Sequence, residues 1–129
     1  MPEQEYIPGV CNINRAEIAY RRKAMWFGVV LTLVIFVLLL LAHVSGAFRL
    51  VLFVPLYIAS IGYLQVKNRF CVAYGTSGKQ NAGEHSTSST DVDDQEALKA
   101  DKKKSLRMNL QAFVVSATLT ILAVLLPAF

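Results

Sequence analysis

The chain has 129 residues, enough for one small domain, and its mean hydropathy of +0.43 is high for a water-soluble protein. Its apolar residues, 54% of the total, gather in three blocks instead of spreading in amphipathic stripes, which argues against an ordinary soluble core. The net charge of +4 comes from 13 Lys and Arg against 9 Asp and Glu. Because the basic residues flank the apolar blocks and form no long patch interleaved with aromatics, we expect no nucleic-acid partner.

Residues 1–24 are expected to form a polar segment beside the membrane on the cytoplasmic side, with a capped helix start. Asn14 is a residue type that caps helix N-termini. Glu17 follows three residues later, where its carboxylate can reach back to the N–H of the cap. The pattern predicts a helix that begins near Arg15 and runs directly into the first apolar block.

Residues 25–66 hold two apolar runs, Met25–Val44 and Leu50–Val66, and neither contains Asp, Glu, Lys or Arg. As a helix, the first run is about 30 Å long, the thickness of one hydrocarbon core. The polar break at Ser45–Arg49 is so short that the second run must return antiparallel to the first. This stretch therefore predicts a transmembrane helical hairpin.

Residues 67–107 are expected to form a cytoplasmic loop, partly disordered, that ends in a basic helix. Gly75 and Gly78 argue against a helix in the first part, and residues 81–94 have the Ser-, Thr- and Asp-rich composition of a mobile loop. From Asp93 onward, acidic residues precede lysines, an order that complements the helix dipole.

Residues 108–129 hold the last apolar block, which ends at Pro127, and we expect a third transmembrane helix there. The predicted fold is thus an all-α integral membrane protein. Twelve Lys and Arg lie before the first span or between the second and third spans, whereas Arg49 alone lies in the first turn. The positive-inside rule then places the N-terminus in the cytoplasm and the C-terminus outside, in a multi-pass protein of a bacterial plasma (inner) membrane.

Small residues recur at helical spacing in the three spans and are expected to form the faces on which the helices pack. These candidate packing residues are Gly28, Thr32, Ala59, Gly62, Ala112, Ser116 and Thr120.

Basic residues flank the spans at the height of the lipid headgroups and are expected to contact membrane lipids. These residues are Arg21, Arg22, Lys23, Lys102, Lys103, Lys104 and Arg107.

Cys11 and Cys71 are the sharpest candidates for chemistry, because each lies near the cytoplasmic end of one hairpin helix. Antiparallel helices bring those ends within about 10 Å, so a thiol pair is geometrically possible. The spacing of these cysteines matches no zinc signature, and we expect no metal and no cofactor. No catalytic set appears on the apolar framework, and we do not expect an enzyme.

These features favour a small non-catalytic accessory or structural subunit that docks on other membrane protein subunits or self-associates through its small-residue faces. One alternative is a thiol-based redox or metal-handling membrane protein that uses the cysteine pair. Another is an oligomeric channel or transport component, which the absence of charged residues from the spans argues against.

Overall fold

The computed structural model describes residues 6–82 and 90–127. Residues 83–89, within the segment predicted to be a mobile loop, lie outside that range. The described chain is mostly helical, with a single pair of two-residue antiparallel strands. In chain order its elements are α1 (Arg15–Leu41), the 3₁₀ helix η1 (Gly46–Leu52), α2 (Phe53–Asn68), α3 (Val72–Ser77), β1 (Lys79–Gln80), β2 (Thr90–Asp91) and α4 (Gln95–Leu125).

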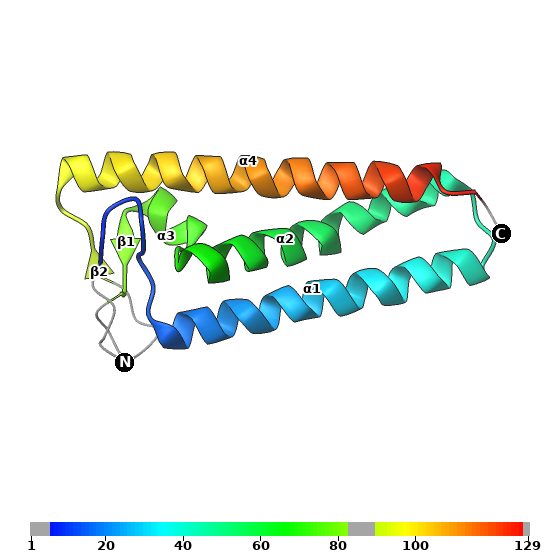
Figure 1. The fold of residues 1–129 in the computed structure, drawn as a ribbon, viewed down its shortest axis with the longest axis horizontal. Coiled ribbons are helices and arrows are strands. Elements are labelled where there is room, and N and C mark those ends of the chain that lie inside the picture. The colour runs from blue at the N-terminus through cyan, green and yellow to red at the C-terminus, as the bar shows by residue number, and fades with distance from the viewer. Residues whose placement is uncertain (1–5, 83–89, 128–129) are drawn as a thin grey trace.

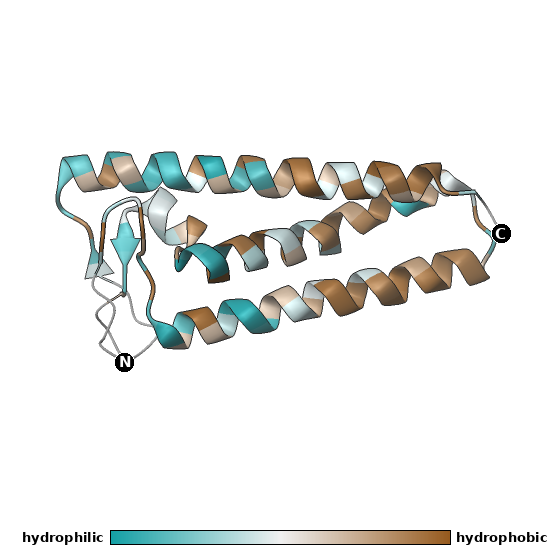
Figure 2. Ribbon diagram, in the orientation of Figure 1, coloured by the Kyte–Doolittle hydropathy of each residue, from teal (hydrophilic) through white to brown (hydrophobic). Residues whose placement is uncertain are grey.

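Three helices are long and apolar enough to cross a membrane: α1, η1 continued by α2, and α4. They lie side by side with α2 between α1 and α4 (Figure 1). Their polar residues gather at the end that holds α3, β1 and β2, and their apolar residues at the opposite end (Figure 2). The predicted class, a mostly helical protein with three helices that could span a membrane, is confirmed at this level.

α1 and α2 approach so closely that two glycines are required between them. A Cβ on Gly28 would lie 2.6 Å from the main-chain N of Ala59 and 2.8 Å from the carbonyl O of Pro55. A Cβ on Gly62 would lie 3.0 Å from the Cα of Met25. The two helices are therefore in direct backbone contact at these points.

α4 packs on α2 through a narrow row of buried residues, of which Ala112, Ser116 and Thr120 lie in the apolar part. The hydroxyl of Ser116 donates to the hydroxyl of Ser60 across the seam, at 3.4 Å. Thr120 instead donates to the carbonyl of Ser116 within its own helix, and Thr32 of α1 donates to the carbonyl of Gly28. Gly28, Gly62 and this α4 row are therefore covered within one chain.

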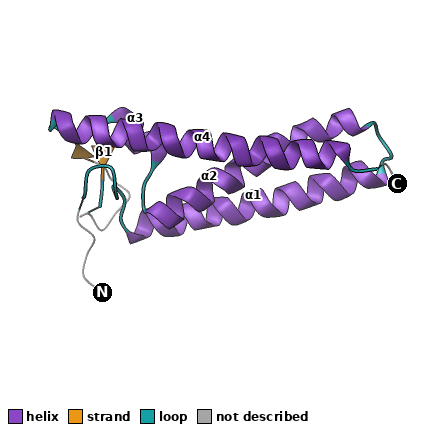
Figure 3. Cartoon of the chain, turned by 45° about the horizontal axis from the view of Figure 1, so that its top comes forward, coloured by secondary structure: helices purple, strands orange, loops and turns teal. Residues whose placement is uncertain are grey.

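The region before the third span differs from the expectation in two respects. The basic helix and the third span are one continuous helix, α4, capped by Asp94, and its first turns run beyond the end of α2 (Figure 3). Gly75 does not prevent a helix but lies inside α3, where a Cβ would collide with the Ser105 hydroxyl and the Phe70 ring. Gly78, at φ +76°, ends that helix.

Arg49 joins η1 to the C-terminal end of α4, at the end of the molecule that lies away from α3, β1 and β2. Its guanidinium donates to the carbonyls of Ala123 and Leu126, at 2.8 and 2.9 Å, and lies 6.0 Å from the ring centroid of Phe36. The residue is buried. The last turn of α4 has no basic residue of its own, so Arg49 supplies both the donors and the positive charge that a helix C-terminus favours.

We expect the substitution Arg49→Met, which keeps an unbranched apolar side chain but removes the donors, to lower the free energy of unfolding by about 2 kcal/mol. The reason is that two carbonyls at the end of α4 lose a charged donor. SDS-induced unfolding in mixed micelles, followed by circular dichroism, measures the effect. Arg49→Lys should recover part of the loss, and a Met variant as stable as the wild type would contradict the assignment.

Candidate functional site

The most elaborate part of the molecule is a polar cap at one end of the helices, which we define as residues 6–21, 69–82 and 95–105. It brings together the N-terminal loop, α3, β1 and the first turns of α1 and α4 (Figure 1). The two predicted thiols, Cys11 and Cys71, both lie in it. Its centre consists of buried polar side chains, and the sequence alone did not single out most of them.

Asn12 is the fully buried hub of the polar cap. Its side-chain Oδ1 accepts from the N–H of Cys71 at 2.7 Å, and its Nδ2 donates to the carbonyl of Cys71 at 3.2 Å. Its own N–H donates to the carbonyl of Arg69, and its carbonyl accepts from the N–H of Asn81. This one residue therefore joins the N-terminal loop, the α2–α3 junction and the segment after β1.

Asn81 extends this connection to the start of α1. Its Oδ1 accepts from the N–H of Asn14, and its Nδ2 donates to Glu17 Oε1, both at 3.2 Å. Asn14 caps α1 by accepting from the N–H of Glu17 at 3.0 Å. The Glu17 carboxylate, which we expected to return to the N–H of Asn14, is linked to it through the Asn81 amide.

Glu17 is a buried carboxylate that is surrounded by donors. Besides Asn81, it accepts from the hydroxyl of Tyr74 at 3.0 Å and pairs with the Arg21 guanidinium at 3.3 Å. A buried carboxylate is tolerated only when it is paired and hydrogen-bonded, and here both conditions hold. The first turn of α1 is therefore bound to α3 as well as to the segment after β1.

We expect the phenol of Tyr74 to titrate late, because burial and the hydrogen bond to Glu17 raise its pKa from 10.0 to about 12. In the unfolded chain the pKa returns to about 10. The stabilisation that this group contributes is therefore complete below about pH 10 and is lost as the pH rises toward 12. The phenolate absorbance of the wild type minus that of Tyr74→Phe isolates this group. A Tyr74 difference centred near pH 10 would contradict the prediction.

Asp101 anchors the N-terminal loop to α4. Its fully buried carboxylate accepts from the Tyr6 hydroxyl at 2.5 Å and from the N–H of Gly9 at 2.7 Å. Gly9 adopts a φ of +70° at this turn of the chain. Burial and this carboxylate hold the pKa of Tyr6 well above its usual range. A signal for Asp101 does exist in the sequence, because it interrupts the lysines of α4 in the same helical row as Ser105 and Ala112.

The two cysteines are buried in the polar cap and are not joined in a disulfide. They lie in the same region because Asn12, which follows Cys11 in the chain, hydrogen-bonds to the N–H and the carbonyl of Cys71. The Cys71 sulfur also accepts from the Arg21 guanidinium at 3.1 Å. Within residues 6–82 and 90–127, no group of three or more His, Cys, Asp and Glu side chains could hold a metal ion.

The candidate headgroup residues fall into two sets. Arg21 and Lys104 are engaged inside the molecule: Arg21 pairs with Glu17, and Lys104 donates to the side chain of Asn68 at 3.0 Å. The others are exposed: Arg22, Lys23, Lys102, Lys103 and Arg107.

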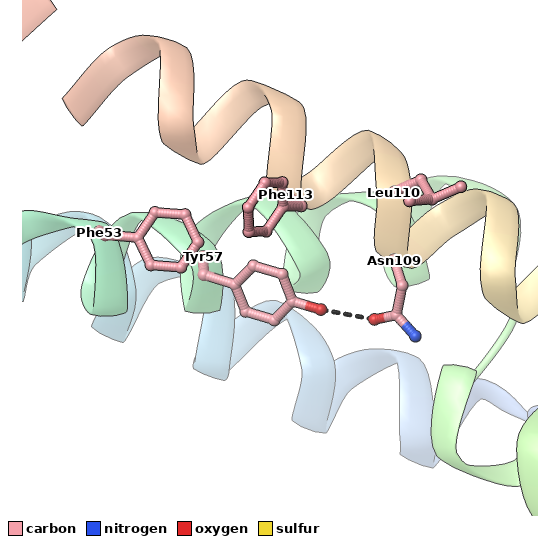
Figure 4. A pocket seen from close by; sticks show the side chains of 5 residues that line it. All are labelled: Phe53, Tyr57, Asn109, Leu110 and Phe113. Atoms are coloured by element: carbon pink, nitrogen blue, oxygen red, sulfur yellow. Dashed lines mark hydrogen bonds between the residues drawn. The ribbon is translucent and has the colours of Figure 1, made fainter. Parts of the chain in front are cut away.

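An apolar groove between α2 and α4 is the second feature of interest. Its upper part has a volume of about 370 Å³ and is lined by Phe53, Tyr57, Asn109, Leu110 and Phe113 (Figure 4). Phe53 and Phe113 meet edge to face, with centroids 5.4 Å apart. The Tyr57 hydroxyl donates to Asn109 Oδ1 at 2.5 Å.

The groove continues below the two phenylalanines as a trough of about 320 Å³, lined by Leu50, Phe53, Phe113, Ala117, Thr120 and Ile121. We refer to the two parts together as the α2–α4 groove.

No protein-family model, no curated protein and no solved structure matches this chain. The polar cap, the α2–α4 groove and the exposed helix faces are therefore the features from which a function can be inferred.

Proposed function

We propose that the protein is a non-catalytic membrane protein that acts as an accessory subunit of a larger membrane complex. The observation that carries this proposal is that most of α1 is not buried within this chain. The polar cap is tightly hydrogen-bonded to itself, whereas α1 buries only Glu17 and Gly28. A helix held along one narrow line leaves most of its apolar surface for a partner or for lipid.

The outer face of α1 has the pattern of a helix-packing seam. Trp26, Val30, Leu33 and Val37 are exposed and follow one another at spacings of four, three and four residues. At 100° per residue, these positions lie opposite Gly28, which faces α2. We call these four residues the α1 seam and propose that a helix of a partner membrane protein packs on it.

The proposed orientation puts the polar cap and the N-terminus in the cytoplasm and the C-terminus outside. Twelve Lys and Arg lie at the cap end and one, Arg49, at the other. The Arg49 side chain also donates to the last carbonyls of α4, so its charge opposes the proposed orientation only weakly. We propose a bacterial plasma membrane as the location.

Extraction from native membranes in a mild detergent, followed by mass spectrometry of the co-purifying chains, tests the accessory role. We expect a stoichiometric partner that is lost from Val30→Trp, where a bulky ring interrupts the α1 seam. Val115→Trp is the matched control, because it adds the same ring to a half-exposed position on α4. A clean monomer in native membranes, or equal loss in both variants, would refute the proposal.

A thiol-based role is a second candidate, favoured by the contact between Arg21 and the Cys71 sulfur and by the position of Cys11 in the same cap. Here the oxidant diamide would take two electrons from the pair as the thiols lose their protons and form a disulfide. We would then expect faster migration on a non-reducing gel, abolished by either Cys11→Ser or Cys71→Ser. Failure to crosslink under oxidation would exclude this role.

An oligomeric channel or transport component is the third candidate. Ion flux across liposomes that contain the purified protein tests it directly, and flux above that of empty liposomes would favour it over the accessory role.

A further inference from the structure

We propose that the α2–α4 groove binds one anionic glycerophospholipid, with its phosphate at Lys102 and Lys103, its ester carbonyl at Asn109 and one acyl chain in the trough. The proposal requires that α2 and α4 cross the membrane, but it does not depend on the accessory role or on a partner at the α1 seam.

The polar end of the groove has a donor that the chain leaves unused. The Asn109 side chain accepts from Tyr57 through Oδ1, and its amide nitrogen points away from that hydroxyl (Figure 4). No residue in the described part of the chain accepts a hydrogen bond from this nitrogen. An amide donor at the head of an apolar groove suits a ligand with a carbonyl oxygen next to a hydrocarbon chain.

The basic residues above the groove supply the charge complementarity. Lys102 and Lys103 are exposed and stand seven residues before Asn109 and Leu110, two helical turns or about 10 Å away on the same face of α4. Leu106, also exposed, continues the apolar face between them. A lysine stem can extend along such a face and hold its ammonium at the headgroup level, where it attracts an anionic phosphate.

The apolar part of the groove has the length of a lipid tail. From Asn109 to Ile121, α4 rises about 18 Å, slightly more than half of a hydrocarbon core of about 30 Å. Along this path the lining is almost entirely apolar, and Thr120 satisfies its hydroxyl within α4. The groove thus changes from cationic to amide to apolar in the order in which a phospholipid presents phosphate, ester and chain.

Native mass spectrometry of the full-length protein, released from vesicles of phosphatidylglycerol or of phosphatidylcholine with identical chains, tests the proposal. We expect one phosphatidylglycerol to be retained and phosphatidylcholine to be retained at least tenfold less. The double variant Lys102→Gln/Lys103→Gln should weaken phosphatidylglycerol retention about tenfold. Its matched control is Arg22→Gln/Lys23→Gln, an exposed basic pair on α1.

Filling the trough separates a seated lipid from a diffuse electrostatic layer. Ala117→Trp should abolish retention, whereas Val115→Trp, on the other side of α4, should leave it unchanged. Ile121→Trp, at the exposed lower end of the trough, repeats the test if Ala117→Trp does not fold. Equal retention of both lipids, equal losses in the two Gln variants, or indifference to the trough variants would each overturn the proposal. So would a protein dimer, in place of a lipid adduct, that the trough variants disrupt.

Discussion

Replacing Asn12 with alanine is expected to destabilise the polar cap by about 2–4 kcal/mol, the largest effect we expect from any cap residue. The side chain is fully buried and satisfies both main-chain groups of Cys71. Alanine would leave a buried donor and a buried acceptor without partners, at a cost of about 1–3 kcal/mol each. The Asn12 main-chain bonds to Arg69 and Asn81 would then have to hold the N-terminal loop alone.

The reactivity of Cys71 provides a direct measurement of this opening. The wild-type thiol is 1% exposed and should react slowly with a maleimide. In a Cys11→Ser background, Asn12→Ala should speed the reaction by roughly 30- to 1,000-fold, since each 1.4 kcal/mol of easier opening is a factor of ten. Asn68→Ala is the control, because the Asn68 side chain hydrogen-bonds to Leu64 and Lys104 and not to Cys71. An unchanged rate in Asn12→Ala would show that Asn12 does not hold the cap closed.

Gly28→Leu is expected to separate α1 from α2 and to lower the free energy of unfolding by about 3 kcal/mol. The Cβ alone would lie 2.6 Å from the main-chain N of Ala59 and 3.0 Å from its Cα, so no side-chain rotation can relieve the collision. Since both contacts are with backbone, the helices must move apart, and the contact between Gly62 and Met25 weakens with them. The better helix propensity of Leu offsets only part of this cost, about 1 kcal/mol.

SDS-induced unfolding in mixed micelles measures the change, and Val30→Leu is the control. Val30 is 55% exposed on the opposite face of α1, so a larger side chain there meets no neighbour of its own chain. We expect a lower unfolding midpoint for Gly28→Leu and an unchanged midpoint for Val30→Leu. Equal midpoints for Gly28→Leu and the wild type would mean that the close approach of the two helices is not a stabilising contact.

The helices could be predicted because their signals are local. Long runs without charge predict spans, and the Asn14 cap was predictable because its partner, Glu17, lies three residues away. Small residues at helical spacing pointed to close packing, and Gly28, Gly62, Ala112 and Ser116 do lie in the helix seams. Thr120 lies in the α4 row as well, although its hydroxyl, like that of Thr32, bonds within its own helix.

The polar cap could not be predicted because its partners are distant in sequence. Asn12 and Cys71 are 59 residues apart, and Tyr6 and Asp101 are 95 residues apart. In a sequence, an asparagine in a loop has the same appearance whether its amide meets water or a buried main chain. Only the docking of the loop on α3 and α4 reveals that Asn12 and Asn81 are structural centres, whereas Asp101 has a local signal in its position among the lysines of α4.

The sequence by itself determined that the protein is mostly helical, that three helices are long and apolar enough to cross a membrane, and where α1 begins, because hydropathy and capping act over a few residues. Tertiary structure alone decided that α2 lies between α1 and α4 and that their small-residue faces are covered within one chain. It also decided that Arg49 closes the end of α4 and that a groove remains between α2 and α4. These features depend on which surfaces meet in space, and the free energy of a buried polar group depends on the partner it finds there.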